Sequence, residues 1–115
     1  MNRIITWDEI DCMINFIVNR LKKKKFSGVY GVPKGGLIPA VMLCHKLNLP
    51  LLAAPANNCI VVDDICDTGK TMDSFGNYNN KKIYKVVLIV RGERKKDVDL
   101  YSQVIDEWIV FPWEE

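Results

Sequence analysis

One run of residues limits the possible folds more than any other, because Cys59-Ile-Val-Val62 is apolar at every position and leads directly into two aspartates. A β-branched run without polar alternation is typical of a strand buried on both faces of a parallel sheet. Residues 84–90 form a second run of this kind, and residues 28–32 form a short β-branched segment before a proline. Residues 104–110 are a candidate last strand, and residues 49–53 are a candidate short one. The pattern therefore predicts a mostly parallel sheet.

Helical segments alternate with these strands. Thr6 and Glu9 have the spacing of a capping box, and apolar residues then recur every three or four positions as far as Leu21. Residues 37–47 form a second apolar helix, and residues 71–75 allow only a short third one. Strands that alternate with helices predict an α/β fold, with a twisted sheet flanked by helices. Ligands of such folds lie beyond the carboxyl ends of the strands, where this chain has two unusual loops, at 33–36 and 64–71.

Length and charge exclude several classes of protein. The chain has 115 residues, which suits one domain over residues 1–115. Its 16 Lys and Arg against 14 Asp and Glu leave a formal charge of +2, which argues against binding nucleic acid through overall charge. The four lysines at 22–25 are consistent with a solvated helix end, because no aromatic residue interleaves with them as in a nucleic-acid patch.

The apolar runs and the cysteines indicate the compartment. No apolar run is long enough to cross a membrane, and the four cysteines include no Cys-x-x-Cys pair. Their neighbours are apolar or strand-like, which suits reduced, mostly buried thiols, although two disulfides stay open in principle. We therefore expect a cytoplasmic protein without nucleic-acid or membrane partners.

Three carboxylates fall within five residues at the end of the 59–63 strand, at Asp63, Asp64 and Asp67. Crowded carboxylates repel one another and lose solvation on burial, so a polyhydroxylated ligand or a divalent cation would give a reason for them. The next residues supply hydroxyls and free backbone N–H groups ahead of a helix, which suits a phosphate. Spacing excludes two familiar phosphate sites, since position 64 lacks the first P-loop glycine and residues 31–36 lack the Gly-x-Gly of a dinucleotide site.

Several of these segments resemble one enzyme family. Val61-Val-Asp-Asp-Ile-Cys-Asp-Thr-Gly-Lys-Thr71 resembles the phosphoribosyl-pyrophosphate (PRPP) motif of the type I phosphoribosyltransferases. Gly31-Val-Pro-Lys-Gly-Gly-Leu-Ile-Pro-Ala40 is similar to the pyrophosphate loop of that family. Ile5-Thr-Trp-Asp8 and Asp106-Glu-Trp-Ile-Val-Phe-Pro-Trp-Glu114 are similar to segments of bacterial xanthine-guanine phosphoribosyltransferases. The resemblance implies the type I phosphoribosyltransferase fold and a purine-salvage reaction that needs Mg²⁺. In that reaction the phosphoribosyl group moves from PRPP to a 6-oxopurine: guanine, xanthine or hypoxanthine.

The resemblance also implies roles for the residues of the two loops. Asp63 and Asp64 would hold the ribose hydroxyls of PRPP, partly through Mg²⁺, and Asp67 would bind near N7 of the purine as the catalytic base or acid. Lys34 and Gly35 would contact pyrophosphate, after a peptide bond that is often cis in the family. Asp67 is also implied to bind PRPP, together with the residues that would bind its 5′-phosphate: Thr68, Gly69, Lys70 and Thr71.

Three more residues are implied to bind the purine. Arg91 stands where the purine enzymes carry a lysine that donates to the exocyclic O6, Trp108 would stack on the base, and the Ile109 backbone would read its edge. Each has an ordinary alternative, because Arg91 suits a surface position and an apolar tryptophan such as Trp108 is often a core residue. Trp7 and Trp113 are assigned to packing.

One departure from the family pattern leaves two functions open. Family members carry a long flexible loop before the strand of the PRPP motif, which closes over the reacting centre and excludes water. Here only residues 49–58 remain, too few for such a lid. The chain is therefore interpreted as a lidless transferase or, alternatively, as a weakly active or inactive PRPP- or nucleotide-binding sensor. By analogy with the family we also expect a homo-oligomer, either a dimer or a tetramer.

Overall fold

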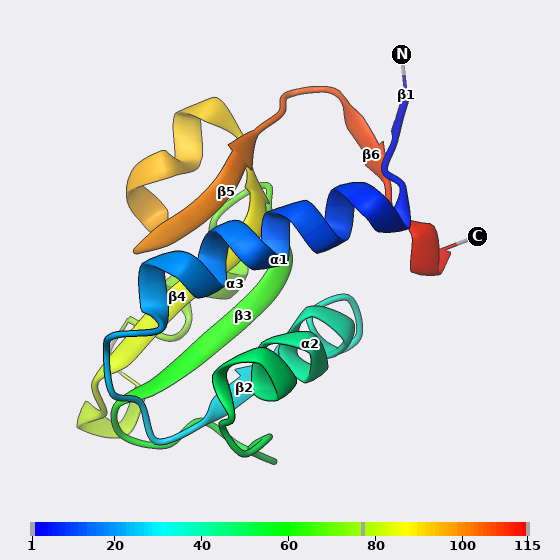
Figure 1. Ribbon diagram of the computed structural model, residues 1–115. Helices are drawn as coiled ribbons and strands as arrows, with labels where there is room; N and C mark the ends of the chain where they lie inside the picture. Colours follow the sequence, from blue (N-terminus) through cyan, green and yellow to red (C-terminus); the bar gives the residue numbers. More distant parts are fainter. Residues whose placement is uncertain (1, 77, 115) are drawn as a thin grey trace.

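The computed structural model describes residues 2–76 and 78–114 (Figure 1). Its strands are β1 (Asn2–Ile4), β2 (Val29–Gly31), β3 (Cys59–Cys66), β4 (Ile83–Val90), β5 (Leu100–Val104) and β6 (Trp108–Val110). Its α-helices are α1 (Trp7–Leu21), α2 (Leu37–Leu47) and α3 (Lys70–Asp73). Three short 3₁₀ segments complete the chain: η1 (Tyr78–Asn80), η2 (Gly92–Asp97) and η3 (Pro112–Glu114).

Four strands form a parallel sheet in the order β2-β3-β4-β5. In the register of this sheet, Val62 of β3 pairs with Gly31 of β2 on one side and with Val86 of β4 on the other. The carboxyl ends of these strands therefore meet at one edge of the sheet. This confirms the predicted parallel α/β architecture and brings the two unusual loops to the same side of the molecule.

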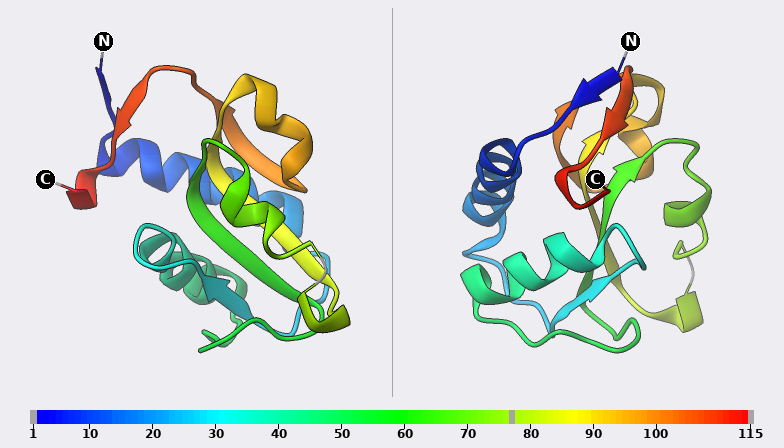
Figure 2. Two further views of the ribbon diagram at one scale, coloured as in Figure 1. Left: turned by 180° about the vertical axis from the view of Figure 1, so that it is seen from behind. Right: turned by 90° about the vertical axis from the view of Figure 1, so that its right-hand side faces the viewer.

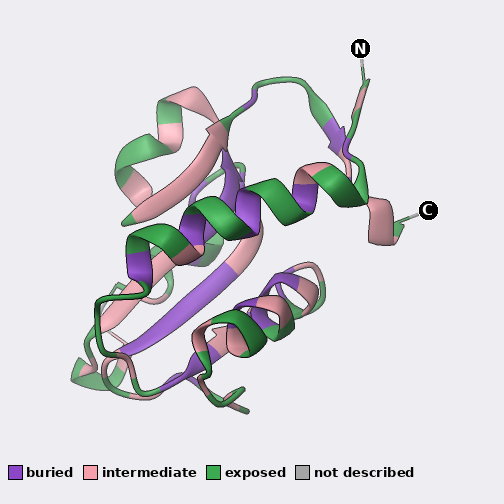
Figure 3. Ribbon diagram, viewed as in Figure 1, coloured by how far each residue is buried: buried purple, intermediate pink, exposed green. Residues whose placement is uncertain are grey.

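Helices cover both faces of β3, which explains why its first four residues are all apolar. Helices α1 and α2 lie on one side of the sheet and the short α3 on the other (Figure 2). Side chains alternate between the two faces of a strand. Val62 accordingly packs in a core with Ile14 of α1 and Leu43 of α2, whereas Val61 packs with Met72 of α3. The buried positions gather on the inner surfaces of these layers (Figure 3).

Helix α1 begins with the predicted capping box. The Thr6 hydroxyl accepts a hydrogen bond from the Glu9 backbone N–H (3.2 Å), and the Glu9 carboxylate accepts one from the Thr6 N–H (3.1 Å). The apolar stripe of this helix is buried at Ile10, Met13, Ile14, Ile17 and Leu21.

The boundaries around the acidic motif differ from the prediction. Strand β3 continues to Cys66, so Asp64 lies in the strand and not in a loop. The reason is that Ile65 and Cys66 remain paired with Ile89 and Val90 of β4. The helix after this loop runs from Lys70 to Asp73, instead of the predicted 71–75.

The predicted strand at 104–110 is wrong as a single element. Strand β5 ends at Val104, and the chain leaves the main sheet before β6 begins at Trp108. Strand β6 then pairs in parallel with β1, a strand that the sequence analysis did not predict. The charged pair at 106–107 interrupts the run, and Asp106 accepts a hydrogen bond from the Gly92 N–H (3.0 Å). Residues 49–53 supply only an isolated bridge, between Leu51 and Val29.

All four cysteines are free thiols. Cys59 and Cys66 are buried as expected, whereas Cys12 is exposed and Cys44 is half-buried. Within residues 2–76 and 78–114, no helix combines the length and the apolar character needed to cross a bilayer.

Candidate active site

The first loop at the sheet edge joins β2 to α2 and packs directly against the end of β3. Its Pro33–Lys34 peptide bond is cis, as the resemblance leads us to expect. The loop turns through a hydrogen bond from the Gly36 N–H to the Val32 carbonyl (2.8 Å). A Cβ atom on Gly35 would lie 2.6 Å from Cγ of Asp64, and one on Gly36 would overlap the Val62 carbonyl oxygen. Glycine is therefore required at both positions for this close approach.

The Asp63–Asp64 pair lies half-buried at the end of β3. Asp63 Oδ1 accepts a hydrogen bond from the Asp64 N–H, and Asp64 Oδ1 accepts one from the Ile65 N–H, both at 2.8 Å. Burial, together with the hydrogen bond and charge of Asp64, raises the pKa of Asp63 to about 8. Burial also raises the pKa of Asp64, and the negative charge of Glu114 adds to this effect. Two carboxylates held together in this way favour a bound cation or hydroxyl donors.

A cavity of about 460 Å³ lies between the first loop and the end of β3. It is lined by Lys34, Gly35, Asp64, Trp113 and Glu114. The fold therefore brings the predicted pyrophosphate-binding residues to one of the predicted ribose-binding carboxylates, although about 30 residues separate them in the sequence. A cation, a carboxylate and an exposed loop backbone then face one space.

Two residues of this cavity were not predicted to belong to the site. Trp113, which was assigned to packing, does stack on Phe111 with ring centroids 4.9 Å apart, but it also lines the cavity. The Glu114 carboxylate accepts a hydrogen bond from the Phe111 N–H (2.7 Å). Their position depends on the pairing of β6 with β1 and therefore gives no signal in the local sequence.

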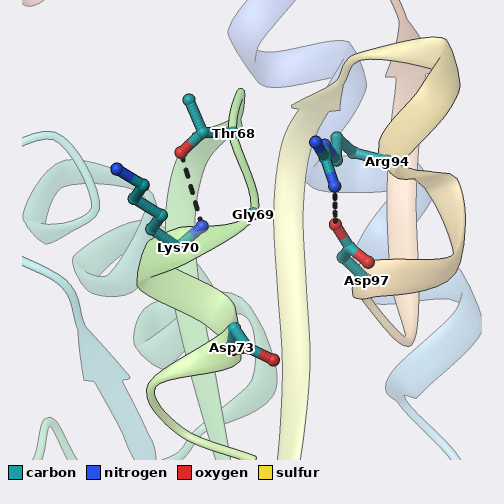
Figure 4. Close-up of a pocket in the computed structure, with 6 residues that line it drawn as sticks. All are labelled: Thr68, Gly69, Lys70, Asp73, Arg94 and Asp97. Carbon is teal, nitrogen blue, oxygen red and sulfur yellow. Dashed lines mark hydrogen bonds and ion pairs between the residues drawn. The ribbon is translucent and has the colours of Figure 1, made fainter.

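The second loop, after β3, turns sharply at Gly69, which has a φ of 85°. A Cβ atom there would also overlap the Asp97 carboxylate, so both the backbone conformation and the lack of space favour glycine at this position. The Thr68 hydroxyl accepts a hydrogen bond from the Lys70 N–H at 3.4 Å. Loop residues line a hollow of about 280 Å³ that faces η2 (Figure 4), and a smaller one of about 80 Å³ includes Asp67 and Thr71. The predicted phosphate-binding residues are thus gathered around two small polar spaces.

The larger hollow contains an ion pair that the sequence analysis missed. Arg94 Nη1 lies 3.6 Å from Asp97 Oδ2, and both side chains lie across from Thr68, Gly69 and Lys70 (Figure 4). Both residues belong to the segment that was interpreted only as a charged connection. The fold brings this segment to the loop because β4, which precedes it, is the neighbour of β3.

Asp67 and Arg91 form a salt bridge, with Arg91 Nε 3.0 Å from Asp67 Oδ1. Arg91 Nη1 also donates to the backbone carbonyls of Ile105 (3.0 Å) and Glu107. The Arg91 side chain is only 13% exposed, whereas that of Asp67 is 56% exposed. The alternative of an ordinary surface arginine is therefore wrong, and the Asp67 carboxylate is open to a ligand.

The two predicted base-binding residues of β6 have opposite environments. Trp108 is 64% exposed, so the alternative of a core tryptophan is wrong and its ring is free to contact a base. Ile109 is 7% exposed and anchors the strand in the core. Trp108 pairs with Asn2 and Ile109 with Arg3 of β1, so β1 fixes the register of this strand.

The residues present fit a magnesium ion only as part of a complex with substrate. No cluster of three or more His, Cys, Asp or Glu side chains suited to a metal occurs in residues 2–76 and 78–114. Mg²⁺ commonly binds through one or two carboxylates together with waters and substrate phosphates. Asp63 and Asp64, whose proximity disfavours two free negative charges, match that requirement.

Comparison with known proteins decides the family. The model of the phosphoribosyl transferase domain family matches residues 52–115, which is more than half of the chain. The chain belongs to this family. The match includes the acidic motif, the loop that follows it and the β6 strand, and it confirms the family and fold inferred from the sequence.

Several purine phosphoribosyltransferases are similar to this family member. The xanthine-guanine phosphoribosyltransferase of Chromohalobacter salexigens is 24% identical over 134 residues, covering 96% of this chain and 82% of the relative. The solved purine phosphoribosyltransferase of Pyrococcus horikoshii is 29% identical with a TM-score of 0.87, covering 99% and 95% of the two chains. The xanthine-guanine-hypoxanthine enzyme of Helicobacter pylori has a TM-score of 0.85 at 18% identity, which shows the shared fold. The roles of individual site residues stay predictions.

Proposed function

We propose that the protein transfers the 5-phosphoribosyl group from PRPP to a 6-oxopurine, giving a nucleoside monophosphate and pyrophosphate. The observation that carries this proposal is the cavity in which Lys34 and Gly35 face Asp64, next to the Asp67–Thr71 loop at the same sheet edge. The ligand of such a site needs a pyrophosphate, vicinal hydroxyls and a terminal phosphate. PRPP has all three on one ribose.

PRPP binding follows from the chemistry of each part of the site. The Lys34 ammonium and the backbone of Gly35 would bind the pyrophosphate, and Asp63 and Asp64 would accept hydrogen bonds from the ribose hydroxyls. The 5′-phosphate would lie in the second loop, against the groups of Thr68, Gly69, Lys70 and Thr71. Backbone N–H groups and hydroxyls in such a loop are well suited to a phosphate dianion.

The reaction displaces pyrophosphate at the anomeric carbon of the ribose. The N9–C1′ bond forms as the bond from C1′ to the pyrophosphate oxygen breaks, and the electron pair leaves with pyrophosphate. Asp67 would take the proton released at N7 of the purine, because its carboxylate is exposed at the end of β3. Lys34 would stabilise the negative charge that develops on the leaving group. Mg²⁺, held by Asp63 and Asp64 with the substrate, would supply further neutralisation of that charge.

Purine recognition is assigned to the segment around β6. The exposed Trp108 ring would stack on the base, and the backbone of Ile109 would bind its edge. The relatives whose names specify xanthine, guanine or hypoxanthine support a 6-oxopurine as the acceptor. A homo-oligomer in the cytoplasm stays a prediction.

A turnover assay tests this function. The purified protein is incubated with PRPP, Mg²⁺ and guanine, xanthine or hypoxanthine, and the nucleoside monophosphate is separated and quantified. We expect a product with at least one base, and a fall of about 10²-fold or more in Asp67→Ala. No product with any of the three bases would refute the transferase proposal.

One observation favours a second function. Residues 48–58, between α2 and β3, contain no helix or strand beyond the isolated Leu51 bridge, so the structure has no long segment there to close over the site. A protein that binds PRPP without turning it over would need no closing loop. PRPP binding in the absence of product would support this sensor function.

A further inference from the structure

Arg91 connects three segments of the site that are far apart in the sequence. It follows β4 directly, and its backbone N–H donates to the carbonyl of Cys66 at the end of β3 (3.1 Å). Its side chain reaches Asp67 through Nε (3.0 Å) and the carbonyl oxygens of Ile105 and Glu107 through Nη1. One largely buried guanidinium therefore joins the loop after β3 to the segment between β5 and β6.

That segment needs such a connection because it leaves the main sheet. Strand β6 pairs with β1 and not with the four-stranded sheet. Figure 1 and the left view of Figure 2 show β6 lying beside β1 and apart from β5. Sheet hydrogen bonds therefore do not fix the position of Trp108 relative to Asp67. The side-chain bonds of Arg91 connect this segment to the end of β3, while the bonds from the Gly92 N–H to Asp106 (3.0 Å) and from the Ile105 N–H to the Val90 carbonyl (3.2 Å) connect it to the end of β4.

The geometry of the contacts requires an arginine. Nε and Nη1 hold their hydrogens in one rigid plane, so an acceptor on Nε and two acceptors on Nη1 have fixed relative positions. A lysine ammonium is a single donor atom on a flexible stem and does not impose this arrangement. Nη2 has no acceptor among residues 2–76 and 78–114, which leaves its hydrogens for the exocyclic oxygen of a bound purine.

We propose that Arg91 is a positioning residue that holds the Asp67 carboxylate and the purine-binding segment 105–109 in one fixed relation. The expected effect of Arg91 on catalysis rests on the proposed function, whereas its hydrogen bonds to Asp67 and to segment 105–109 are present in the free protein. When Trp108 binds a purine, N7 then lies against Asp67 without any rearrangement of the two segments. This role is separate from donation to the base, because it uses different nitrogens of the same side chain.

The test compares Arg91→Met, Arg91→Lys and the control Arg20→Lys, which changes an arginine on α1 that packs over Phe16 and lies outside the site. The first measurement is amide hydrogen exchange of the peptide covering residues 105–109 in the free protein. We expect exchange to be at least about tenfold faster in both Arg91 variants and unchanged in the control. Unchanged exchange in Arg91→Lys and Arg91→Met would overturn the proposal, and Arg91→Lys alone decides this if Arg91→Met does not fold.

The second measurement is steady-state kinetics with each substrate varied. We expect kcat/KM for the purine to fall about 10²-fold in Arg91→Met, because misplacement of a reacting group by about 1 Å has an effect of this size. KM for PRPP should stay within about twofold of the wild type, since Arg91 contacts none of the assigned PRPP ligands except Asp67. Arg91→Lys should remain close to Arg91→Met. Recovery of the wild-type value by Arg91→Lys would show that a charge and a donor suffice, and would refute the positioning role.

The two proposals fail in distinguishable ways. A wild-type protein without turnover refutes the transferase function, and the exchange measurement still decides whether Arg91 holds segment 105–109. If the wild type turns over and the Arg91 substitutions leave the hydrogen exchange of residues 105–109 unchanged, only the role of Arg91 is refuted.

Discussion

Replacement of Gly35 by alanine perturbs the contact between the two halves of the site. The new Cβ would lie 2.6 Å from Cγ of Asp64, about 0.8 Å short of an ordinary 3.4 Å contact. Rotation of the Asp64 carboxylate would relieve the overlap but would break its 2.8 Å hydrogen bond with the Ile65 N–H. Loss of a hydrogen bond to a charged group costs about 1.5–3 kcal/mol, and movement of the loop would cost about as much through overpacking. We therefore expect the free energy of unfolding to fall by about 1–3 kcal/mol.

The same change should weaken PRPP binding, because it displaces both a pyrophosphate ligand and a ribose ligand. A loss of about 1.4–2.8 kcal/mol corresponds to about a 10- to 100-fold increase in Kd. Urea denaturation and calorimetric titration with PRPP measure the two effects. Gly92→Ala is the matched control, because its Cβ would meet nothing nearer than Asp106 Oδ2 at 3.5 Å. If Gly35→Ala matched Gly92→Ala in both measurements, the assigned contact between loop and carboxylate would be wrong.

Two further changes test the base site and the acidic pair. Trp108→Ala should raise KM for the purine about tenfold, since loss of base stacking costs about 1–3 kcal/mol, while the free energy of unfolding changes by less than about 0.5 kcal/mol because the ring is exposed. Phe16→Ala, which removes a partly exposed ring on α1 outside the site, should leave that KM unchanged, and an equal effect of both would contradict the assignment. Without added metal, the stability of the wild type should fall as pH rises from about 4 to 8, because the raised pKa of Asp63 makes the folded state bind the proton that the unfolded state releases. Asp63→Asn should flatten this slope in urea titrations at several pH values, and an unchanged slope would show that Asp63 is not its source.

The motifs that are local in sequence could be predicted from it. The all-apolar run before Asp63 indicated a strand covered on both faces, and Val61 and Val62 do pack against opposite layers. Gly35 and Gly69 both lie in segments that were predicted to be loops, and the structure places each of them in close contact with an aspartate. In these cases the local structure is determined by residues that lie within a few positions of one another in the sequence.

The contacts that complete the site were not predictable in this way. The pairing of β1 with β6 joins segments about 106 residues apart in register, and a three-residue strand carries almost no periodic signal. It is this pairing that brings Trp113 to the cavity. Arg91 and Asp67 were both singled out, but nothing in their spacing indicated that they bind each other. Such pairings follow from the order of strands in the sheet, which sequence patterns do not specify.

Calorimetric titration of the protein with PRPP in the presence of Mg²⁺ tests most directly whether the acidic motif binds a phosphorylated sugar. The wild type and the control Asp11→Asn, whose carboxylate lies on α1 near Lys46, should bind PRPP at one site with equal affinity. The double variant Asp63→Asn with Asp64→Asn should bind it at least about 100-fold more weakly, since amides replace both of the carboxyl groups assigned to the ribose hydroxyls and to Mg²⁺. Undiminished binding by the double variant would contradict the account.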